Sequence, residues 1–254
     1  MVMRFLVIAG LGFMTQLIDG TLGMGYGVTS ATLLISLGVY PAIASASVHT
    51  AEVVVSLASG VSHFKLGNVR KDIFFALTIC GVLGGVLGAY GLVNLPVRPV
   101  KLVVSSILLA MGTIILYRFW LLRSKPVLER DGNSSFRRLA LLGFCAAFID
   151  AMGGGGWGPI CTPSLIIAGN NPQEVVGSVN LAEFFITLAM TITFVVLIGP
   201  ENFLWDVVIA LLIAGLAAAP VAALLCKRLP HRILGILVGL AVVVLSARML
   251  LTAW

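Results

Sequence analysis

Charged side chains are scarce in this sequence, and that scarcity limits the class of protein. Only 10% of the 254 residues are charged and 59% are hydrophobic, whereas soluble globular domains have about 25% charged and about 45–50% apolar residues. The mean hydropathy is +1.10, and the apolar residues form long runs that are nearly free of charge. These proportions exclude a soluble globular domain and predict an all-α polytopic membrane protein.

Cysteine and histidine are also rare, with four and three copies. No C-x-x-C pair is present, and no histidine stands at metal-ligand spacing from a cysteine, so we expect neither a metal site nor a disulfide framework. The cysteines lie in or beside apolar runs and are expected to be packing residues. His63 stands beside basic residues at the expected end of a span, and we predict that it lies at the membrane interface.

Signatures of enzymes and of nucleotide binding are missing as well. The chain has no H-E-x-x-H, no G-x-S-x-G and no Gly-Lys-Ser/Thr after a glycine run, which argues against an intramembrane enzyme and a phosphate-binding loop. We therefore predict neither enzymatic activity nor a cofactor. The net charge of +6 does not indicate a nucleic-acid partner, because basic residues in loops between spans set membrane orientation.

The chain contains an internal repeat. A shift of 131 positions aligns residues 12–54 with residues 143–185 without a gap, and 15 of the 43 positions are identical. After a three-residue insertion the register resumes at a shift of 134. An apolar composition does not by itself produce paired aspartates, prolines and glutamates. We therefore expect two homologous halves, residues 1–122 and 138–254, joined by a charged linker at 123–137. The paired polar and proline residues are Asp19/Asp150, Pro41/Pro172 and Glu52/Glu183.

Each half begins with an unusual element. The segments 5–18 and 28–37 are apolar but shorter than the roughly 20 residues that a full span requires, and a Gly-rich turn separates them. We predict a helical hairpin, re-entrant or broken, over residues 5–37 and its copy over residues 139–168. Three ordinary spans are expected to follow each hairpin, at about 43–63, 73–93 and 99–119 and at about 174–198, 205–226 and 231–252.

The two halves are predicted to be inverted relative to each other. A re-entrant hairpin returns to the side from which it entered, so a hairpin and three spans reverse the second half; broken spans would instead make the repeats parallel. The loop with Lys65, Arg70 and Lys71 corresponds to a loop with Glu201 and Asp206 and no basic residue. Basic loops mark the cytoplasmic side, so we expect the linker to be cytoplasmic and the protein to lie in a bacterial inner membrane.

The two hairpin tips are the predicted binding site. They have the sequences DGTLGMGYG at residues 19–27 and DAMGGGGWGP at residues 150–159. Each tip opens a helix, whose free N–H groups and positive dipole end favour an anion, and paired helix ends of this kind recur in transporters. The alternative is that the glycines only permit close packing. The expected substrate contacts in the tips are Gly23, Gly25, Tyr26, Gly27, Gly154, Gly155, Gly156, Trp157 and Gly158.

The span after each hairpin carries polar residues at matching positions. Glu52 and Glu183 each follow a polar residue by three positions, so each pair shares one helix face. Ionisable residues inside a span are costly and indicate function. The two glutamates are expected to be proton-coupling sites or, alternatively, carboxylates that hold the hairpins in place. The remaining substrate contacts that we predict on these spans are His49, Thr50 and Asn180.

Two aspartates and two aromatic residues flank the glycines. Asp19 and Asp150 directly precede the tips, where a carboxylate can cap free N–H groups or contact a substrate or ion. Tyr26 and Trp157 occupy equivalent positions and are expected to be walls of the site or plugs that gate it. Cys161 follows the second tip and is better explained as a buried small residue than as a sulfur relay.

With these tips, their aspartates and the duplicated half in view, the sequence resembles the TauE/SafE family of sulfite and organosulfur anion transporters over nearly its whole length. In that family a Gly-rich segment precedes a proline, matched here by 23–27 with Pro41 and by 153–158 with Pro163 and Pro172. The resemblance implies secondary transport of a small sulfur-containing anion such as sulfite or an organosulfonate. The first tip, Gly-Met-Gly-Tyr-Gly, departs from an unbroken glycine run, so its site is expected to be narrower or more hydrophobic.

The leading functional hypothesis is an alternating-access transporter that exports a small inorganic or organosulfur anion by proton coupling. The anion is expected to lie at the midplane between the two tips. A passive anion channel with the same tips as its filter, and import in place of export, remain alternatives. The other expected partner is membrane lipid, and the sequence leaves the oligomeric state open.

Overall fold

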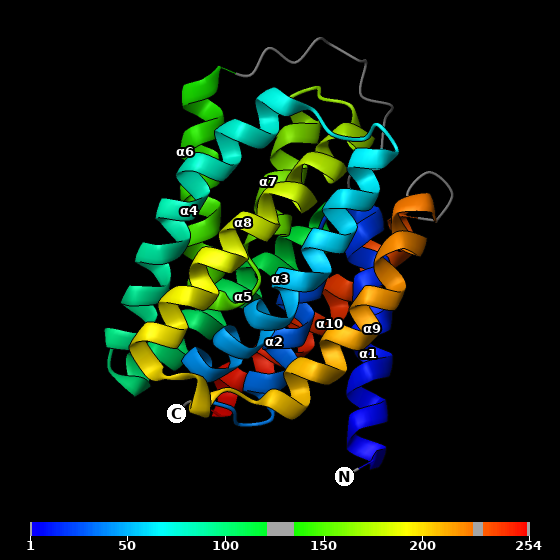
Figure 1. Cartoon of the computed structure of the whole chain (residues 1–254). Helices are drawn as coiled ribbons and strands as arrows, with labels where there is room; N and C mark the ends of the chain where they lie inside the picture. Colours follow the sequence, from blue (N-terminus) through cyan, green and yellow to red (C-terminus); the bar gives the residue numbers. More distant parts are fainter. Residues whose placement is uncertain (1, 121–134, 226–230, 253–254) are drawn as a thin grey trace.

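The protein is a bundle of helices. The computed structural model describes residues 2–120, 135–225 and 231–252, and Figure 1 shows that the elements in these ranges are helical. The all-α class predicted from the sequence is thereby confirmed. The elements are α1 (Val2–Leu22), α2 (Tyr26–Ser36), α3 (Pro41–Lys65), α4 (Lys71–Asn94), α5 (Val97–Trp120), α6 (Phe136–Gly153), α7 (Trp157–Ile167), α8 (Pro172–Ile198), the short 3-10 helix η1 (Pro200–Asn202), α9 (Trp205–Leu225) and α10 (His231–Thr252).

Five of the described helices are long and apolar enough to cross a membrane. They are α1, α3, α4, α8 and α9. Large apolar side chains such as Leu83, Ile192 and Val196 are exposed on the outside of the bundle, a surface that a bilayer accommodates and water does not. The chain is therefore a multi-pass membrane protein.

The first helix is longer than the sequence analysis predicted. The expected apolar segment ended at residue 18, but α1 continues to Leu22 and has an apolar stretch long enough to span. Asp19 and Gly20 do not interrupt it, because the Asp19 carboxyl is satisfied by a backbone N–H beyond the helix end. Gly20 packs against Ala222, to which an added Cβ would come within 2.5 Å. Each tip thus joins one long helix to one short helix of 11 residues, α2 or α7.

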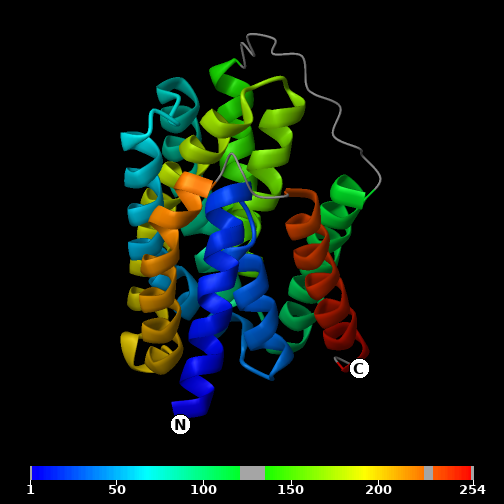
Figure 2. The ribbon, with the colours of Figure 1, turned by 90° about the vertical axis from the view of Figure 1, so that its right-hand side faces the viewer.

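The first helices of the two halves begin on opposite sides of the bundle. In Figure 2, α1 rises from the N-terminus at the bottom and α2 runs back down beside it. The green helix α6 begins at the top and runs down, and α7 returns upward. We call the two faces the N-terminal side, where α1 begins, and the α6 side, where α6 begins.

Equivalent residues of the two halves make equivalent contacts. The Ser47 hydroxyl of α3 accepts a hydrogen bond of 3.0 Å from the backbone N–H of Leu204, directly before α9. The Ser178 hydroxyl of α8 accepts one of 2.8 Å from the N–H of Arg70, directly before α4. Each serine therefore satisfies an N–H at the start of a helix from the other half, a role otherwise taken by a local N-cap.

The closest helix pairs follow the same scheme. α1 packs along α9 and α6 packs along α4, while α3 and α8 lie against each other at the centre. Gly12 of α1 faces Leu211, and its counterpart Gly143 of α6 faces the backbone of Leu77, each at a distance where an added Cβ would be crowded. Small residues let membrane helices approach this closely.

Candidate functional site

Both helix breaks lie at the centre of the bundle, where they touch. Gly23 and Gly154 hold equivalent positions with φ of 67° and 72°, the left-handed region that favours glycine. The Thr162 hydroxyl of α7 donates a 2.7 Å hydrogen bond to the carbonyl oxygen of Gly23. An added Cβ at Gly155 would overlap the backbone of Val28. Close packing of one tip against the other is therefore one role of these glycines.

A small cavity lies between the tips. Its volume is about 10 Å³, which is roughly the space of one water molecule. Asp19 of α1, Glu52 of α3, Asp150 of α6 and Glu183 of α8 all line it, so four acidic residues from four helices converge there. The other lining residues are Gly25, Gly27, Val28, Gly155, Gly158 and Pro159.

The two aspartates cap the short helices. Tyr26 donates its backbone N–H to Asp19 Oδ1 at 3.3 Å, and Gly156 donates its N–H to Asp150 Oδ1 at 2.7 Å. Capping of a free N–H group is one of the two roles predicted from the sequence for both aspartates. The expectation that the tips present free N–H groups is wrong for Tyr26 and Gly156, because a carboxylate of the protein already accepts from each of them.

His49 connects acidic residues of the two halves. Its Nδ1 lies 2.8 Å from Glu52 Oε2, and its Nε2 faces Asp150, 4.0 Å from Oδ2. The imidazole is fully buried and Nε2 has no hydrogen-bond partner. The ring is stacked on Phe194 of α8, which fixes its plane. Among the described residues, His49 is therefore the group beside these acids that carries a positive charge when its imidazole is protonated.

The second half has no counterpart of this arrangement. Asn180, at the position equivalent to His49, donates from Nδ2 to the carbonyl oxygen of Val176 at 3.0 Å and accepts from the Ser59 hydroxyl at 2.7 Å. Its amide thus joins α8 to α3 and does not line the cavity. Thr50 also lies away from the cavity, where its hydroxyl donates to Ala46 in the preceding turn.

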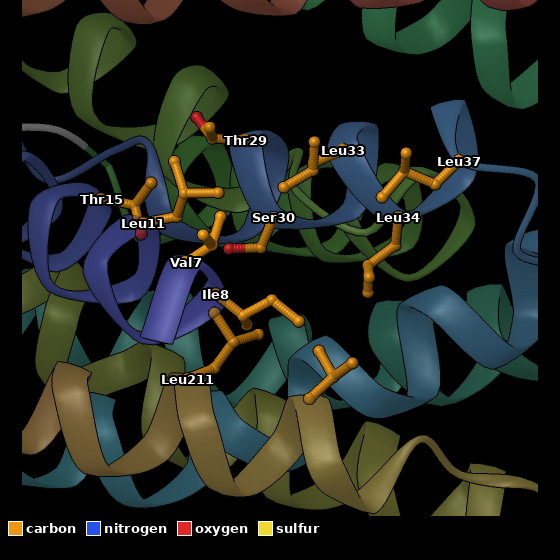
Figure 3. A pocket seen from close by; sticks show the side chains of 11 residues that line it. Val7, Ile8, Leu11, Thr15, Thr29, Ser30, Leu33, Leu34, Leu37 and Leu211 are labelled. Atoms are coloured by element: carbon orange, nitrogen blue, oxygen red, sulfur yellow. The ribbon is translucent and has the colours of Figure 1, made fainter. Parts of the chain in front are cut away.

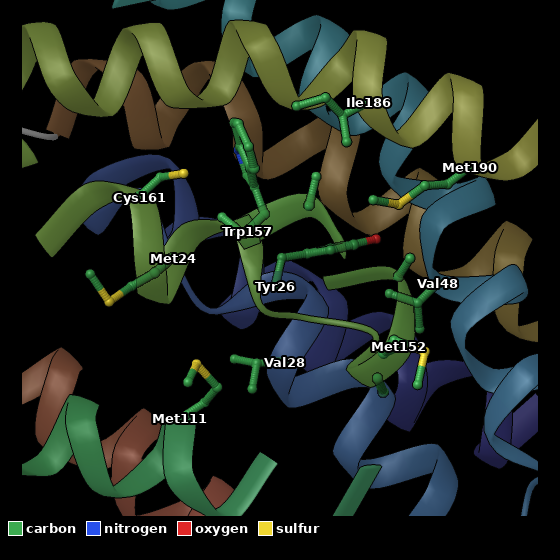
Figure 4. Packing of buried hydrophobic residues seen from close by; sticks show 14 of the residues in the cluster. Met24, Tyr26, Val28, Val48, Met111, Met152, Trp157, Cys161, Ile186 and Met190 are labelled. Atoms are coloured by element: carbon green, nitrogen blue, oxygen red, sulfur yellow. The ribbon is translucent and has the colours of Figure 1, made fainter. Parts of the chain in front are cut away.

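Tyr26 and Trp157 lie next to the cavity but do not line it. Figure 4 shows both rings at the centre of the buried apolar cluster, and each is only 1% exposed. Trp157 Nε1 donates to the carbonyl oxygen of Val179 at 3.1 Å, whereas the Tyr26 hydroxyl is buried without a hydrogen-bond partner. Both side chains are therefore part of the buried core of the bundle.

The cavity includes two residues that the sequence analysis missed. Val28 and Pro159 directly follow Gly27 and Gly158, and they are equivalent in the internal repeat. The internal repeat could have identified them, because each directly follows a predicted tip glycine at the same position of the repeat. Four predicted tip residues, Gly25, Gly27, Gly155 and Gly158, do line the cavity. The other predicted glycines, Gly23, Gly154 and Gly156, belong to the surrounding backbone turns.

His63 and the cysteines have simple structural roles. His63 is fully buried, contrary to the interfacial position expected, because its Nε2 lies 3.1 Å from the carbonyl oxygen of Gly20 and joins α3 to α1. Cys161 is buried, as expected of a packing residue, whereas Cys80 is half-buried and Cys145 is exposed, contrary to that expectation; all three are free thiols. Cys226 lies outside the described residues. No group of three or more His, Cys, Asp or Glu side chains in the described ranges is arranged to hold a metal ion.

A second, larger cavity opens beside the first tip. It has a volume of about 430 Å³ and lies between α1, α2 and α9 (Figure 3). Apolar side chains make up most of its wall, and three hydroxyl residues, Thr15, Thr29 and Ser30, contribute to it. The apolar wall residues are Val7, Ile8, Leu11, Leu33, Leu34, Leu37, Val207 and Leu211.

Comparison with known proteins places the chain in a family. The sequence profile of the family described as "Sulfite exporter TauE/SafE" matches residues 8–249. The probable membrane transporter protein YtnM of Bacillus subtilis (strain 168) is 45% identical over 253 residues, which cover 99% of this chain and 84% of that protein. The probable membrane transporter protein YdhB of the same organism is 24% identical over 148 residues, 58% of this chain and 60% of that protein. No solved structure matches significantly. With a family profile over nearly its whole length and a 45% identical relative, the chain belongs to the TauE/SafE family of membrane transporters.

Proposed function

We propose that the protein exports a small sulfur-containing anion, of the sulfite or organosulfonate class, across the bacterial cytoplasmic membrane and couples this export to protons. The family description names sulfite exporters, and the two relatives are named only as probable membrane transporters. The observation that carries the proposal is the convergence of two glycine-rich helix starts and four acidic residues on one cavity. The helix starts attract an anion, and the acids take up protons.

The proposed architecture is a pair of inverted repeats, residues 1–122 and 138–254, with a linker at 123–137. Its support is that α1 and α6 begin on opposite sides and that Ser47 and Ser178 make matching contacts across the halves. The α6 side is proposed to be cytoplasmic. Lys65 and Lys71 stand on that side, at the end of α3 and the start of α4, and basic residues favour the cytoplasm.

Proton coupling follows from the charges at the cavity. Four carboxylates around about 10 Å³ would repel an incoming anion, and buried charges are stable only when paired or neutralised. An anion therefore binds when protons reduce this negative charge and the tips move apart enough to admit it. We propose Gly25, Gly27, Gly155 and Gly158 as backbone contacts, with Glu52 and Glu183 as proton-carrying groups. Tyr26 and Trp157 would be plugs that move during transport.

Flux through purified protein in liposomes tests this function. Sulfite, sulfoacetate, thiosulfate, sulfate and chloride are compared with and without an imposed pH gradient, and liposomes without protein give the background. Sulfur-anion flux that follows the pH gradient is the expected result. Flux that ignores the gradient and accepts chloride would show a passive channel instead. An absence of flux for all five anions would overturn the proposal.

A further inference from the structure

The contact between His49 and Asp150 differs from every other polar contact at the cavity. Asp19 and Asp150 each accept a hydrogen bond from the backbone N–H that they cap. The second oxygen of Asp150, however, points toward a buried imidazole nitrogen that has no hydrogen-bond partner. A buried polar atom without a hydrogen-bond partner costs free energy. The unpaired Nε2, 4.0 Å from Asp150 Oδ2, therefore calls for a functional explanation.

We propose that Asp150 is an internal anion that the substrate displaces from the start of α7, and that His49 receives it together with one proton. The proposal rests on the proposed transport function and adds the place where the coupled proton binds. In the state described, Asp150 Oδ1 occupies the N–H of Gly156 at 2.7 Å. That N–H is one of those that a substrate anion at this helix start would use. Substrate and carboxylate therefore compete for the same donor.

The imidazole is held ready for the displaced carboxylate. Glu52 Oε2 lies 2.8 Å from His49 Nδ1, which favours the tautomer with its proton on Nδ1 and leaves Nε2 without one. A proton from solvent that binds at Nε2 makes the ring an imidazolium, which then donates to both Glu52 and Asp150. Asp150 needs to move only about 1 Å to come from 4.0 Å into hydrogen-bond distance. The site thus gains one proton when it gains one anion, and because the two cross together, the outward gradient of the anion drives the export.

The other titratable groups around Asp150 come from five helices. They are Asp19 of α1, Tyr26 of α2, Glu52 of α3, Cys161 of α7 and Glu183 of α8. None of these side chains has a basic nitrogen that lies unpartnered near an aspartate. In the second half, where the counterpart of His49 is Asn180, the amide is already bonded to Val176 and Ser59. Asp19 therefore has no equivalent receiver, and the proton is taken up at one tip only.

Calorimetry of anion binding tests this inference on the full-length protein in detergent. The probes are methanesulfonate, sulfoacetate and sulfate, whose sulfur groups stay ionised between about pH 5 and pH 8, where histidine titrates. Titrations in buffers with different ionisation enthalpies give the number of protons taken up per anion. Wild-type protein is expected to take up at least one proton, so that the Kd of the anion rises at least about tenfold per pH unit over part of this range.

Three variants separate a coupling role from a structural one. His49→Asn copies the residue of the second half and is expected to bind the anion with about one linked proton fewer than wild type and a shallower pH profile. Asp150→Asn, which no longer competes as an anion, is expected to bind at least as tightly as wild type and also with about one linked proton fewer. Asp19→Asn makes the same change at the other tip and is expected to lose less of the proton uptake than Asp150→Asn does.

The outcomes distinguish this inference from the function on which it rests. If His49→Asn and Asp150→Asn bind the anion with wild-type proton uptake, the inference is overturned and the transport function stands. If Asp19→Asn loses the proton uptake as fully as Asp150→Asn does, the location at one tip is overturned. If none of the three anions binds the wild-type protein, the proposed function fails and the inference fails with it.

Discussion

Gly155 of one tip lies against the backbone of Val28 in the other, so closely that an added Cβ would overlap the Val28 nitrogen and Cα. The two tips therefore support each other directly, and the cavity between them is small because no side chain separates them at this point. The contact joins residues that are far apart in the sequence and come from opposite halves of the chain.

Gly155→Ala is predicted to abolish anion flux and to lower stability. The methyl group must push the tips apart, and overpacking of this kind costs about 1–3 kcal/mol. Thermal unfolding in detergent and flux in liposomes are the measurements. Gly10→Ala is the control, because nothing lies within 4 Å of a Cβ there, and this variant should behave like wild type. Normal flux through Gly155→Ala would mean that close contact between the tips is not needed for transport.

Glu183→Gln is predicted to alter the pH dependence of transport more than the affinity at low pH. The change removes one carboxylate from the cavity, so the anion no longer requires protonation of that group and flux at high pH should rise. Flux measured across a series of external pH values tests this. Glu201→Gln, in the exposed turn before α9, is the control. An unchanged pH profile for Glu183→Gln would make this glutamate a structural residue.

Ser47→Ala and Ser178→Ala are predicted to destabilise the protein by similar amounts. Each removes the hydroxyl that accepts from a helix-start N–H of the other half, a loss of about 1 kcal/mol for a typical cap. Melting temperatures of the two variants should fall in parallel. Ser164→Ala is the control, since the exposed Ser164 hydroxyl bonds only within its own helix. A large effect at one serine and none at the other would argue against equivalent roles in two inverted repeats.

Ser30→Cys is predicted to react with a small charged thiol reagent, because Ser30, although only 6% exposed, lines the cavity of about 430 Å³. Its counterpart in the repeat, Cys161, is fully buried and should stay unreactive in the same state. The test uses protein in which Cys80, Cys145 and Cys226 are replaced. Reaction at Ser30→Cys only with an apolar reagent would indicate that lipid, and not water, fills this cavity.

The sequence predicted the helical elements well because hydropathy and spacing are local properties. The expected segment 43–63 lies within α3, and 174–198 lies within α8. The end of α1 was predicted four residues early, because Asp19 and Gly20 usually mark a break. A contact seven residues away, from Tyr26 to Asp19, satisfies the carboxyl and lets the helix continue.

The candidate site was predicted only in outline. The repeat indicated Asp150, Glu52 and Glu183 as residues of one site, and all three line the cavity. The sequence could not indicate that Asp150 occupies the Gly156 N–H, nor that Asn180 turns away from the cavity. Those details depend on which side chains lie within hydrogen-bond distance of each donor once helices from both halves have packed together.

The sequence by itself determined that the chain is a helical membrane protein, and it predicted a duplicated chain with acidic residues at its glycine tips, because composition and internal similarity require no knowledge of packing. Only the tertiary structure decided that His49 from the first half faces Asp150 from the second. It also decided that the space between the tips is about 10 Å³. Both follow from contacts between residues about 100 positions apart, which local preferences along the chain do not specify.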